Sequence, residues 1–453
     1  GESLPVEVTA GAAVLAGSVN TDGLLEIVVT QVGGATTLGK IIALMRTAER
    51  AKPPVSRLLD AFAGPYLALV LAIAAGTWFA SGDMAATLAV LVASCPCALV
   101  LAAPATAVAA IAVAARHGIL IKSAAFLERL AEVACVLFDK TGTLTEGELT
   151  VLRVVATPGA RAGEGEWEVA RLAASLGAAS HHPVSRAAAR GWQPSALLPV
   201  AAVREIGGFG VTGLLDGEEV ALGRASPADM LSNGMPSPHD GPAAAVRRDG
   251  RVLGWLLLGD RVRPEAGAAL ADLRALGLSR QAIVTGDRDA VAASVAAQLG
   301  IADVTAAAMP EAKLRRVLAE VAAGRLPMVV GDGINDSLAL RAGAVGVAMG
   351  ARGTDVALAS ADLVLMSSDL RRLGTAIRLS RRCRRTIGVN VAIGLVWTAA
   401  LVGLAATGAL GAQGAIVAAL LHNLSTFVGL GNAGRLMLFD ETAGTVVSSA
   451  AMS

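Results

Sequence analysis

Three long stretches without Asp, Glu, Lys or Arg interrupt the pattern of hydrophobic and polar positions along the chain. They cover residues 61–82, 84–115 and 386–434. A helix needs about 20 apolar residues to cross a bilayer, so the first stretch predicts one helix and the last predicts two, joined by a turn near residues 408–414. The middle stretch predicts one long helix or one with a distorted middle. The pattern favours four membrane spans over buried core helices, which rarely run this long without a charge.

Basic residues gather at one end of each predicted span. The turn at residues 81–83 carries none, whereas the opposite ends carry many. These are Lys40, Arg46, Arg50, Lys52 and Arg57 before the first span, Arg116 and Lys122 after the second, Arg381, Arg382, Arg384 and Arg385 before the third, and Arg435 after the fourth. Since Lys and Arg are enriched in cytoplasmic flanks, we expect every large segment outside the spans to lie in the cytoplasm.

The long segment between the second and third spans has the pattern of a parallel sheet. Residues 133–138, 282–284 and 328–330 are short apolar runs, each followed by Asp or by a short turn that contains Asp. Its middle, residues 148–258, is expected to be an inserted α+β domain with a hairpin at Arg248-Asp249-Gly250. Ahead of the first span, short β-strands of a small domain are predicted around Val6, Val8, Val14 and Leu15 and over residues 24–30.

Composition supports a membrane protein and excludes other classes. The 453 residues are 54% hydrophobic and 17% charged, which is too apolar for an ordinary soluble enzyme. A net charge of +1 and 3% aromatic residues give neither attraction to nucleic acid nor a stacking surface for bases. Four cysteines make no disulfide framework, and we expect Cys135 and Cys383 to be structural. The chain starts at Gly1 without a signal peptide, so we expect a fragment of a longer protein.

The most informative motif is Asp-Lys-Thr-Gly-Thr-Leu-Thr at residues 139–145. It follows the apolar run at residues 133–138, which places Asp139 at the carboxyl end of a predicted parallel strand, where open α/β sheets carry their chemistry. The residues after it are small, polar and rich in backbone donors, which suits a phosphate group. Asp139 is therefore a candidate nucleophile that becomes an aspartyl-phosphate.

Two further acidic turns follow the other apolar runs. Thr285-Gly286-Asp287 comes after the second run, and residues 331–336, Gly-Asp-Gly-Ile-Asn-Asp, come after the third. The carboxylates suit Mg²⁺, a hard cation that takes oxygen ligands, and Lys313 could neutralise phosphate charge. Gly-Asp-Gly alone is an ordinary turn; the set of three strand-end motifs is what indicates phosphoryl chemistry.

A second kind of chemistry is predicted inside the second span, at Cys95-Pro96-Cys97. On a regular helix, residues i and i+2 point about 200° apart, so the two sulfurs could not share one metal. Pro96 disrupts the turn, which can bring both sulfurs and freed carbonyls toward a cavity. Thiolates select soft or borderline ions such as Cu(I) and Zn²⁺. The alternative is a pair of buried cysteines that act as small hydrophobic residues beside a kink.

Together these motifs resemble the P-type ATPases. Asp139-Lys140-Thr141-Gly142-Thr143 matches that family's phosphorylation signature, and the Cys-Pro-Cys resembles its heavy-metal-transporting branch. The resemblance implies a transmembrane helix bundle, an α/β haloacid-dehalogenase-like phosphorylation domain with an inserted α+β nucleotide-binding domain, and a partial β actuator domain. The implied boundaries are 1–47 for the actuator part, 48–117 for two transmembrane helices, 118–147 and 259–385 for the phosphorylation domain, 148–258 for the nucleotide-binding domain, 386–434 for two more transmembrane helices and 435–453 for a tail.

The resemblance also implies roles for individual residues. Asp139 would attack the γ-phosphate of ATP, and Lys140 and Asp287 belong to the same catalytic set. Mg²⁺ would be held by Asp139, Asp332, Asp336 and the carbonyl of Thr141, while Thr285, Gly286, Lys313 and Asn335 would complete the phosphate pocket. Glu2 would position water for hydrolysis of the aspartyl-phosphate, and by itself it is merely a terminal carboxylate.

The inserted domain carries a candidate nucleotide site. Residues 180–183, Ser-His-His-Pro, and the glycines of residues 205–211 resemble the branch's adenine-nucleotide motifs. The residues carried over are His182, Glu205, Gly208 and Gly210. Without the resemblance, two adjacent histidines are usually a surface feature, and a Gly-Phe-Gly is a weak signal.

The last two spans contain polar residues that are further candidates for ion ligands. They are His422, Asn423, Ser425 and Thr426, with Asn432 farther along, and Asn390 in the third span. Polar residues inside a membrane are costly and are functional candidates by default; hydrogen bonding between helices is the alternative. The set departs from the patterns of copper and zinc pumps, and the only tyrosine, Tyr66, lies in the first span, so the ion stays open. His422 with two thiolates would suit a divalent borderline ion.

The sequence thus predicts a pump in a membrane, expected to be the plasma (inner) membrane, that exports a transition-metal cation at the expense of ATP. Expected partners are ATP, Mg²⁺, the metal ion, the lipid bilayer and a metal-delivery protein. Two alternatives remain: a membrane-tethered haloacid-dehalogenase-type phosphohydrolase, which would not need the Cys-Pro-Cys, and an inactive fragment of the pump.

Overall fold

The computed structural model describes residues 8–12, 14, 20, 24–30, 32, 56–95, 97–157, 165–190, 193, 196–225, 241–332, 336–350 and 360–440. The chain divides into two compact units. The first comprises residues 1–42, 138–266 and 282–309, and the second comprises residues 43–137, 267–281 and 310–453.

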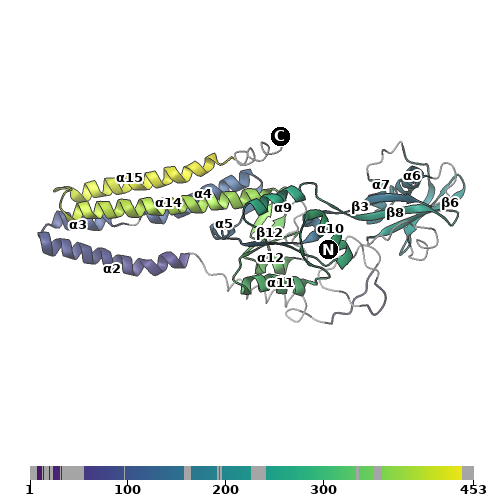
Figure 1. Cartoon of the computed structure of the whole chain (residues 1–453), viewed down its shortest axis with the longest axis horizontal. Helices are drawn as coiled ribbons and strands as arrows, with labels where there is room; N and C mark the ends of the chain where they lie inside the picture. The colour runs from purple at the N-terminus through teal and green to yellow at the C-terminus, as the bar shows by residue number, and fades with distance from the viewer. Residues whose placement is uncertain are drawn as a thin grey trace. The chain divides into compact units, whose positions relative to one another are not determined.

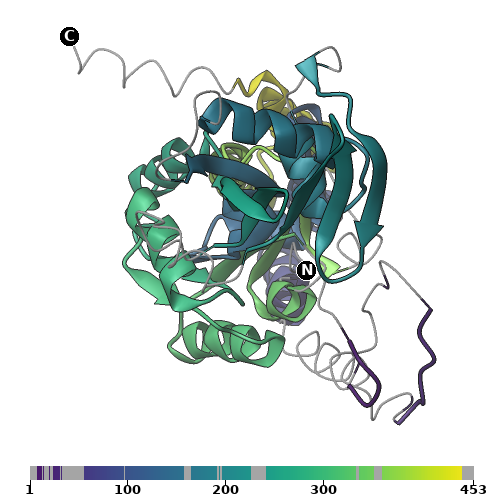
Figure 2. The ribbon, with the colours of Figure 1, turned by 90° about the vertical axis from the view of Figure 1, so that its right-hand side faces the viewer.

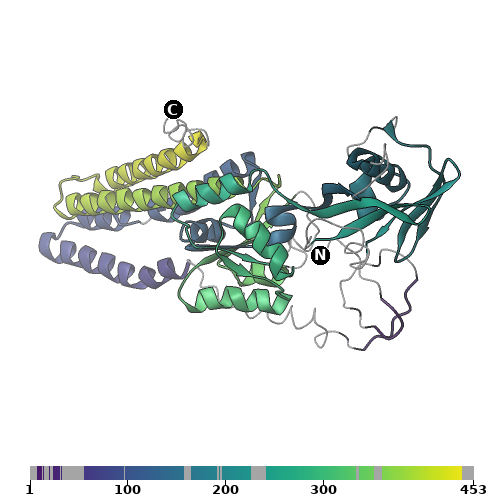
Figure 3. The same ribbon diagram turned by 45° about the vertical axis from the view of Figure 1, so that its right-hand side comes forward.

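Long apolar helices of the second unit run side by side (Figures 1 and 3). They are α2 (Ser56–Ser81), α3 (Met84–Ala93), α4 (Cys97–Arg116), α14 (Arg372–Ala406) and α15 (Gly414–Gly434), followed by a short 3₁₀ turn at Arg435–Leu438. Buried small residues at their contacts include Ala74, Ala89, Ala93 and Ala405. Small side chains let helix backbones approach closely, which is the usual packing of helices in lipid.

The predicted spans are confirmed in part. Among the described residues, the segments Gly64–Ser81, Arg372–Ala406 and Gly414–Leu438 are long and apolar enough to cross a membrane. The second predicted span is broken: α3 ends at Ala93 after 10 residues, and α4 begins at Cys97. The physical reason lies in the sequence, because proline has no N–H to continue the hydrogen-bond ladder of a helix. The distorted middle that the sequence predicts is therefore present.

The parallel strands predicted around the acidic turns are also present. The seven-stranded sheet has the order β1-β13-β12-β11-β2-β9-β10. Its strands are β1 (Ile119–Ile121), β2 (Cys135–Phe138), β9 (Gln281–Val284), β10 (Asp303–Thr305), β11 (Pro327–Gly331), β12 (Val345–Met349) and β13 (Leu363–Leu365). The register is parallel for β10/β9, β11/β12 and β12/β13, and β1 adds an antiparallel edge. Strands β2, β9 and β11 are buried along their whole length, as expected for a sheet covered on both faces.

Helices accompany these strands in the chain. They are α5 (Ala124–Leu130), α9 (Ala266–Ala275), α10 (Asp289–Leu299), α11 (Pro310–Ala322) and α12 (Ser337–Ala342). Helix α11 is amphipathic: Lys313, Leu314, Val317 and Glu320 are its buried residues, at the spacing of one helix face.

The middle of the long segment forms a separate antiparallel sheet of six strands in the order β3-β8-β7-β6-β5-β4. The strands are β3 (Thr145–Ala156), β4 (Ala201–Ile206), β5 (Gly210–Leu215), β6 (Glu218–Arg224), β7 (Ala243–Arg248) and β8 (Arg251–Val262). Residues 249 and 250 join β7 to β8 with positive φ angles, which is the two-residue hairpin predicted from the sequence. The expected domain borders at 148 and 258 fall inside the continuous strands β3 and β8.

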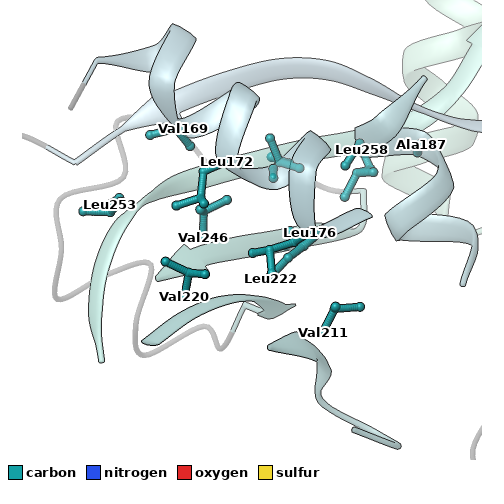
Figure 4. Packing of buried hydrophobic residues seen from close by; sticks show 14 of the residues in the cluster. Val169, Leu172, Leu176, Ala187, Val211, Val220, Leu222, Val246, Leu253 and Leu258 are labelled. Atoms are coloured by element: carbon teal, nitrogen blue, oxygen red, sulfur yellow. The ribbon is translucent and has the colours of Figure 1, made fainter. Parts of the chain in front are cut away.

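Helices α6 (Glu166–Gly177) and α7 (Pro183–Ala189) lie on one side of this sheet (Figures 2 and 4). Val169, Leu172 and Leu176 recur at three- and four-residue spacing on α6 and point at sheet residues such as Leu222 and Val246 (Figure 4). Burial of this stripe holds the helices on the sheet.

One predicted strand is absent. Residues 24–30 are described without strand structure, and so are Val8 and Val14; Val6 and Leu15 lie outside the described residues. Leu24 is 99% exposed and Val28 is 85% exposed. A strand needs a neighbour that supplies its backbone hydrogen bonds, and none of the described residues pairs with this segment. Alternation alone therefore overpredicted sheet structure here.

Candidate functional site

Asp139 immediately follows β2 and begins a tight turn over Lys140–Leu144. It is 9% exposed. The turn is closed by the hydroxyl of Thr145, which donates to the carbonyl of Lys140 at 2.9 Å. Gly147 lies against this turn with φ +70°, and a Cβ there would be 2.9 Å from the Cα of Gly142. Only glycine fits this close approach without strain.

The turn and the Thr285-Gly286-Asp287 segment form one polar cluster within the first unit. Lys140 Nζ lies 2.6 Å from Asp287 Oδ2, and the hydroxyl of Thr285 donates to the same carboxylate at 3.2 Å. The backbone N–H of Asp287 donates to Thr285 Oγ1, also at 3.2 Å. Two of the three strand-end motifs are thus joined by side-chain contacts, and a lysine charge is held among them.

Asp260 and Arg263 support the turn, and neither was predicted as a site residue. Asp260 shares the single proton of the Thr145 hydroxyl with the Lys140 carbonyl and accepts another hydrogen bond, at 2.9 Å, from the Gly147 N–H. Burial raises the pKa of the Asp260 carboxyl, against the opposing effect of the Thr145 hydrogen bond. The guanidinium of Arg263 donates to the carbonyls of Thr143, at 2.9 Å, and Gly142, at 3.1 Å. These side chains fix the carbonyls of the turn that carries the nucleophile.

The third strand-end motif contributes a buried ion pair within the second unit. Lys313 Nζ on α11 lies 2.6 Å from Asp336 Oδ1, and both side chains are buried. Oδ2 of Asp336 has no hydrogen-bond partner in the described part of the chain. A Cβ at Gly331 would be 2.6 Å from this same oxygen, so the absence of a side chain at 331 makes room for the carboxylate. Asp332 follows β11 directly; Asn335 and Glu2 lie outside the described residues.

The donor set fits Mg²⁺. The strand-end side chains supply carboxylate oxygens, including Oδ2 of Asp336, which is buried and has no hydrogen-bond partner among the described residues. Mg²⁺ keeps several waters and takes only one or two carboxylates plus substrate phosphate. Among the described residues, no three His, Cys, Asp or Glu side chains are grouped to hold a metal.

The four candidate nucleotide residues lie at the start of α7 and around the β4–β5 turn. His182 caps α7: its Nδ1 accepts from the N–H of Val184 at 3.3 Å. Glu205 is exposed near the end of β4, and Gly208 lies in the turn that follows. Gly210 begins β5 with φ +144°, and a Cβ there would be 2.1 Å from the carbonyl oxygen of Leu222. No side chain fits at residue 210, because the backbone of β6 passes close to it at Leu222 and Gly223.

At the break between α3 and α4 in the helix bundle, a side chain donates a hydrogen bond to a backbone carbonyl. The hydroxyl of Tyr66 on α2 donates to the carbonyl of Ser94, directly before Cys95. The Cys95 N–H turns back to the carbonyl of Val92 at 3.3 Å. The sulfur of Cys95 is in a disulfide bond, so a thiolate metal site requires the reduced form. Pro96 lies outside the described residues.

On helix α15, the side chains of His422 and Ser425 are buried, whereas the side chain of Asn423 is exposed. His422 is 6% exposed, and neither ring nitrogen has a hydrogen-bond partner in the described part of the chain. The hydroxyls of Ser425 and Thr426 donate to the His422 carbonyl, at 2.6 and 3.5 Å. Both hydroxyl groups therefore donate to the backbone of α15 itself.

Asn390 belongs to a different polar cluster. Its amide nitrogen donates to the Gly429 carbonyl at 3.2 Å and to the Thr106 hydroxyl at 3.4 Å, and its oxygen accepts from Asn432 at 2.7 Å. Interhelical hydrogen bonding, the alternative considered from the sequence, is what the structure shows for this residue. The cluster connects α4, α14 and α15.

Cys135 and Cys383 are buried free thiols. Burial raises the pKa of the Cys135 thiol to about 11, so this thiol stays protonated near neutral pH and is unreactive. Both positions agree with the structural role predicted for them.

Comparison with known proteins identifies the family. The family model for haloacid dehalogenase-like hydrolases matches residues 133–343, and that for the P-type ATPase actuator domain matches residues 1–46. The crystal structure of a zinc-transporting PIB-type ATPase in the E2.Pi state superposes with a TM-score of 0.77 at 33% identity, over 89% of this chain and 68% of that one. The chain belongs to the heavy-metal-transporting P-type ATPases.

Curated relatives within this family differ in their metals. The chain is 36% identical to a probable copper-exporting P-type ATPase V of Mycobacterium tuberculosis, over 98% of this chain and 59% of the relative. It is 35% identical to a manganese-exporting P-type ATPase of the same organism, over 97% and 62%, and 36% identical to a zinc/cadmium/lead-transporting P-type ATPase of Escherichia coli, over 96% and 60%. The chain thus spans about three fifths of the length of these P-type ATPases.

Proposed function

We propose that this P-type ATPase chain uses ATP to move a transition-metal cation across a membrane through an aspartyl-phosphate at Asp139. The observation that carries the proposal is the Asp139 turn, held by Asp260 and Arg263 and joined to Lys140 and Asp287. A nucleophilic carboxylate beside fixed positive charge is what phosphoryl transfer requires. Strands β11, β2 and β9 are neighbours in the sheet, and each is followed in the chain by one of the three strand-end motifs.

Phosphorylation proceeds by attack of a carboxylate oxygen of Asp139 on the γ-phosphorus of ATP. A bond from that oxygen to phosphorus forms, the bond to the bridging oxygen breaks, and ADP leaves. Lys140 and Lys313 balance the negative charge of the transferred group, and the Thr285 hydroxyl and Gly286 N–H bind its oxygens. Mg²⁺ at Asp139, Asp332, Asp336 and the Thr141 carbonyl would screen the phosphate charge. Asn335 would orient the group from the same side.

Nucleotide binds to the antiparallel domain. His182 and Glu205 recognise the adenine moiety, and the backbone at Gly208 and Gly210 approaches it closely. After transfer, a water molecule attacks the phosphorus of the aspartyl-phosphate while Glu2 accepts its proton. Inorganic phosphate leaves and the Asp139 carboxylate is regenerated.

The transported ion binds in the helix bundle at the Cys95 and Cys97 sulfurs. Coupling requires that the metal site and the phosphate site favour different conformations of the protein. We further propose that transport is export from the cytoplasm across the plasma (inner) membrane and that a metal-delivery protein supplies the ion.

The test measures acid-stable incorporation of the γ-phosphate from ATP into the whole protein, with and without added metal under reducing conditions. Asp139→Asn should abolish incorporation, and Cys95→Ser with Cys97→Ser should abolish only its stimulation by metal. Metal-independent phosphorylation that survives the double cysteine substitution would favour a membrane-tethered phosphohydrolase. Incorporation that persists in Asp139→Asn would refute the proposed nucleophile.

A further inference from the structure

We infer that Arg247 is a positioning residue of the nucleotide site and that it acts through the ring of Phe209. The inference rests on the proposed function, because it concerns how the antiparallel domain holds ATP. It starts from one contact: the guanidinium carbon of Arg247 on β7 lies 5.6 Å from the centroid of the Phe209 ring, within the range of an attractive cation–π contact. Phe209 lies between Gly208 and Gly210, two of the four candidate nucleotide residues.

Phe209 ends the tight turn between β4 and β5. Its N–H donates to the carbonyl of Ile206 at 3.1 Å, which closes the turn. Gly208 adopts φ +75° and Gly210 adopts φ +144°, which are backbone conformations that other residues rarely adopt. Glycine is conformationally permissive, so these two residues do not fix the shape of the turn by themselves. The geometry of the turn therefore depends on contacts from outside it.

Phe209 makes such contacts with its ring and with its carbonyl. The ring rests on the backbone of β6 at Gly223, where a Cβ would be 2.8 Å from the ring carbon Cζ. The Phe209 carbonyl accepts from the N–H of Arg224 at 2.8 Å. Arg247 covers the ring, and its Nη2 donates to the carbonyl of the same Arg224 at 3.4 Å. These four residues form a closed set of contacts that ties the turn to β6 and β7.

Arg247 acts from the face of the sheet that is opposite to helices α6 and α7. Side chains alternate between the two faces along a strand, and Leu222 and Val246 point toward the helices (Figure 4). Gly223 and Arg247 follow them directly and so belong to the other face, since β6 and β7 pair without a register shift here. His182 caps α7, on the helix side. Arg247 therefore holds the turn from behind and does not itself bind ATP.

The experiment measures phosphorylation of the whole protein over a series of ATP concentrations. Arg247→Ala should raise the ATP concentration that gives the half-maximal rate about fivefold or more. The maximal rate should stay the same, because the Asp139 turn makes none of these contacts, and this rate also serves as the check of folding. Arg248→Ala is the matched control: Arg248 is the next residue on β7, and its guanidinium pairs with the exposed Glu218, so this variant should respond to ATP like the unmodified protein.

A double-mutant cycle tests whether Arg247 acts through the ring. Phe209→Leu removes the ring and should by itself raise the half-maximal ATP concentration. In that background, Arg247→Ala should change this concentration by no more than about twofold, because two residues that act through one contact are not additive. A general effect of removing a positive charge would instead appear in full in both backgrounds.

The outcomes separate this inference from the proposed function. If the unmodified protein is phosphorylated at Asp139 but Arg247→Ala leaves the half-maximal ATP concentration within about twofold, the inference is wrong and the proposed function stands. Equal effects of Arg247→Ala and Arg248→Ala, additive effects of the Arg247 and Phe209 substitutions, or a fall in the maximal rate alone would also overturn it. If ATP does not phosphorylate the unmodified protein, the proposed function itself fails.

Discussion

The buried Glu320 on α11 offers a quantitative test of what holds the phosphorylation domain together. Its side chain is 0% exposed and contacts three guanidinium groups, those of Arg280, Arg316 and Arg325. The hydrogen bonds from Arg280, and then those from Arg325 and Arg316, outweigh burial and lower the pKa of this carboxyl from 4.5 to about 2. At about 1.4 kcal/mol for each pKa unit, the charged form stabilises the folded state by about 3 kcal/mol.

The pH dependence has a definite sign. The pKa is lower in the folded state, so the stabilisation is fully present above pH 4.5 and is lost as the pH falls toward 2. Glu320→Gln should remove this stabilisation at neutral pH, because the three arginines then lose the negative charge of Glu320. Local opening of α11 and β11 should become easier by about 3 kcal/mol, which corresponds to about 100-fold faster amide exchange.

Hydrogen exchange of the whole protein, followed by mass spectrometry of peptides from α11 and β11, measures this opening. The control is Glu218→Gln, the same substitution at an exposed pair with Arg248, where the exchange of β6 and β7 should change by less than about tenfold. An effect of Glu320→Gln no larger than that of the control would refute the reasoning. Because Lys313 lies two turns earlier on the same buried face, a weakened α11 should also slow phosphorylation.

Two further predictions concern the Asp139 turn and the nucleotide domain. Arg263→Ala removes the donors to the Thr143 and Gly142 carbonyls; we expect phosphorylation from ATP to slow about 10-fold or more with unchanged ATP affinity, and a loss of affinity instead would contradict a positioning role. Gly210→Ala forces a Cβ against the Leu222 carbonyl and should weaken ATP binding about 10-fold in calorimetry, whereas Gly207→Ala, where a Cβ meets nothing within 4 Å, should bind ATP normally.

Local signals were enough to predict the main elements of this chain. The run at residues 133–138 anticipated β2 and the position of Asp139 directly after it, and the charge-free stretches anticipated α2, α14 and α15. Each of these features depends on residues that are neighbours in sequence, where burial on both faces or contact with lipid leaves a visible pattern. For the same reason, the break at Cys95 was foreseeable from Pro96.

Contacts between residues distant in sequence were not predictable. Asp260 reaches Thr145 across 115 residues, and Arg263 reaches Thr143 across 120. Nothing in the local sequence distinguishes Asp260 on β8, or Arg263 just after it, from ordinary polar positions. Tyr66 was set aside because it lies in the first span, yet its hydroxyl meets the Ser94 carbonyl 28 residues away. Conversely, residues 24–30 alternate like a strand but have no strand partner among the residues that the structure describes.

The two long strands β3 and β8 have a mechanical consequence. Each runs for 12 residues, and they are hydrogen-bonded to each other from the Asp139 turn into the antiparallel sheet, with register shifts between Thr145 and Leu149 and between Val151 and Arg153. Hydrogen bonding along the two strands resists stretching, whereas irregular pairing bends the strands and increases their local twist. Rotation of the antiparallel sheet relative to the Asp139 turn should therefore be concentrated in the few residues where the pairing of β3 and β8 shifts.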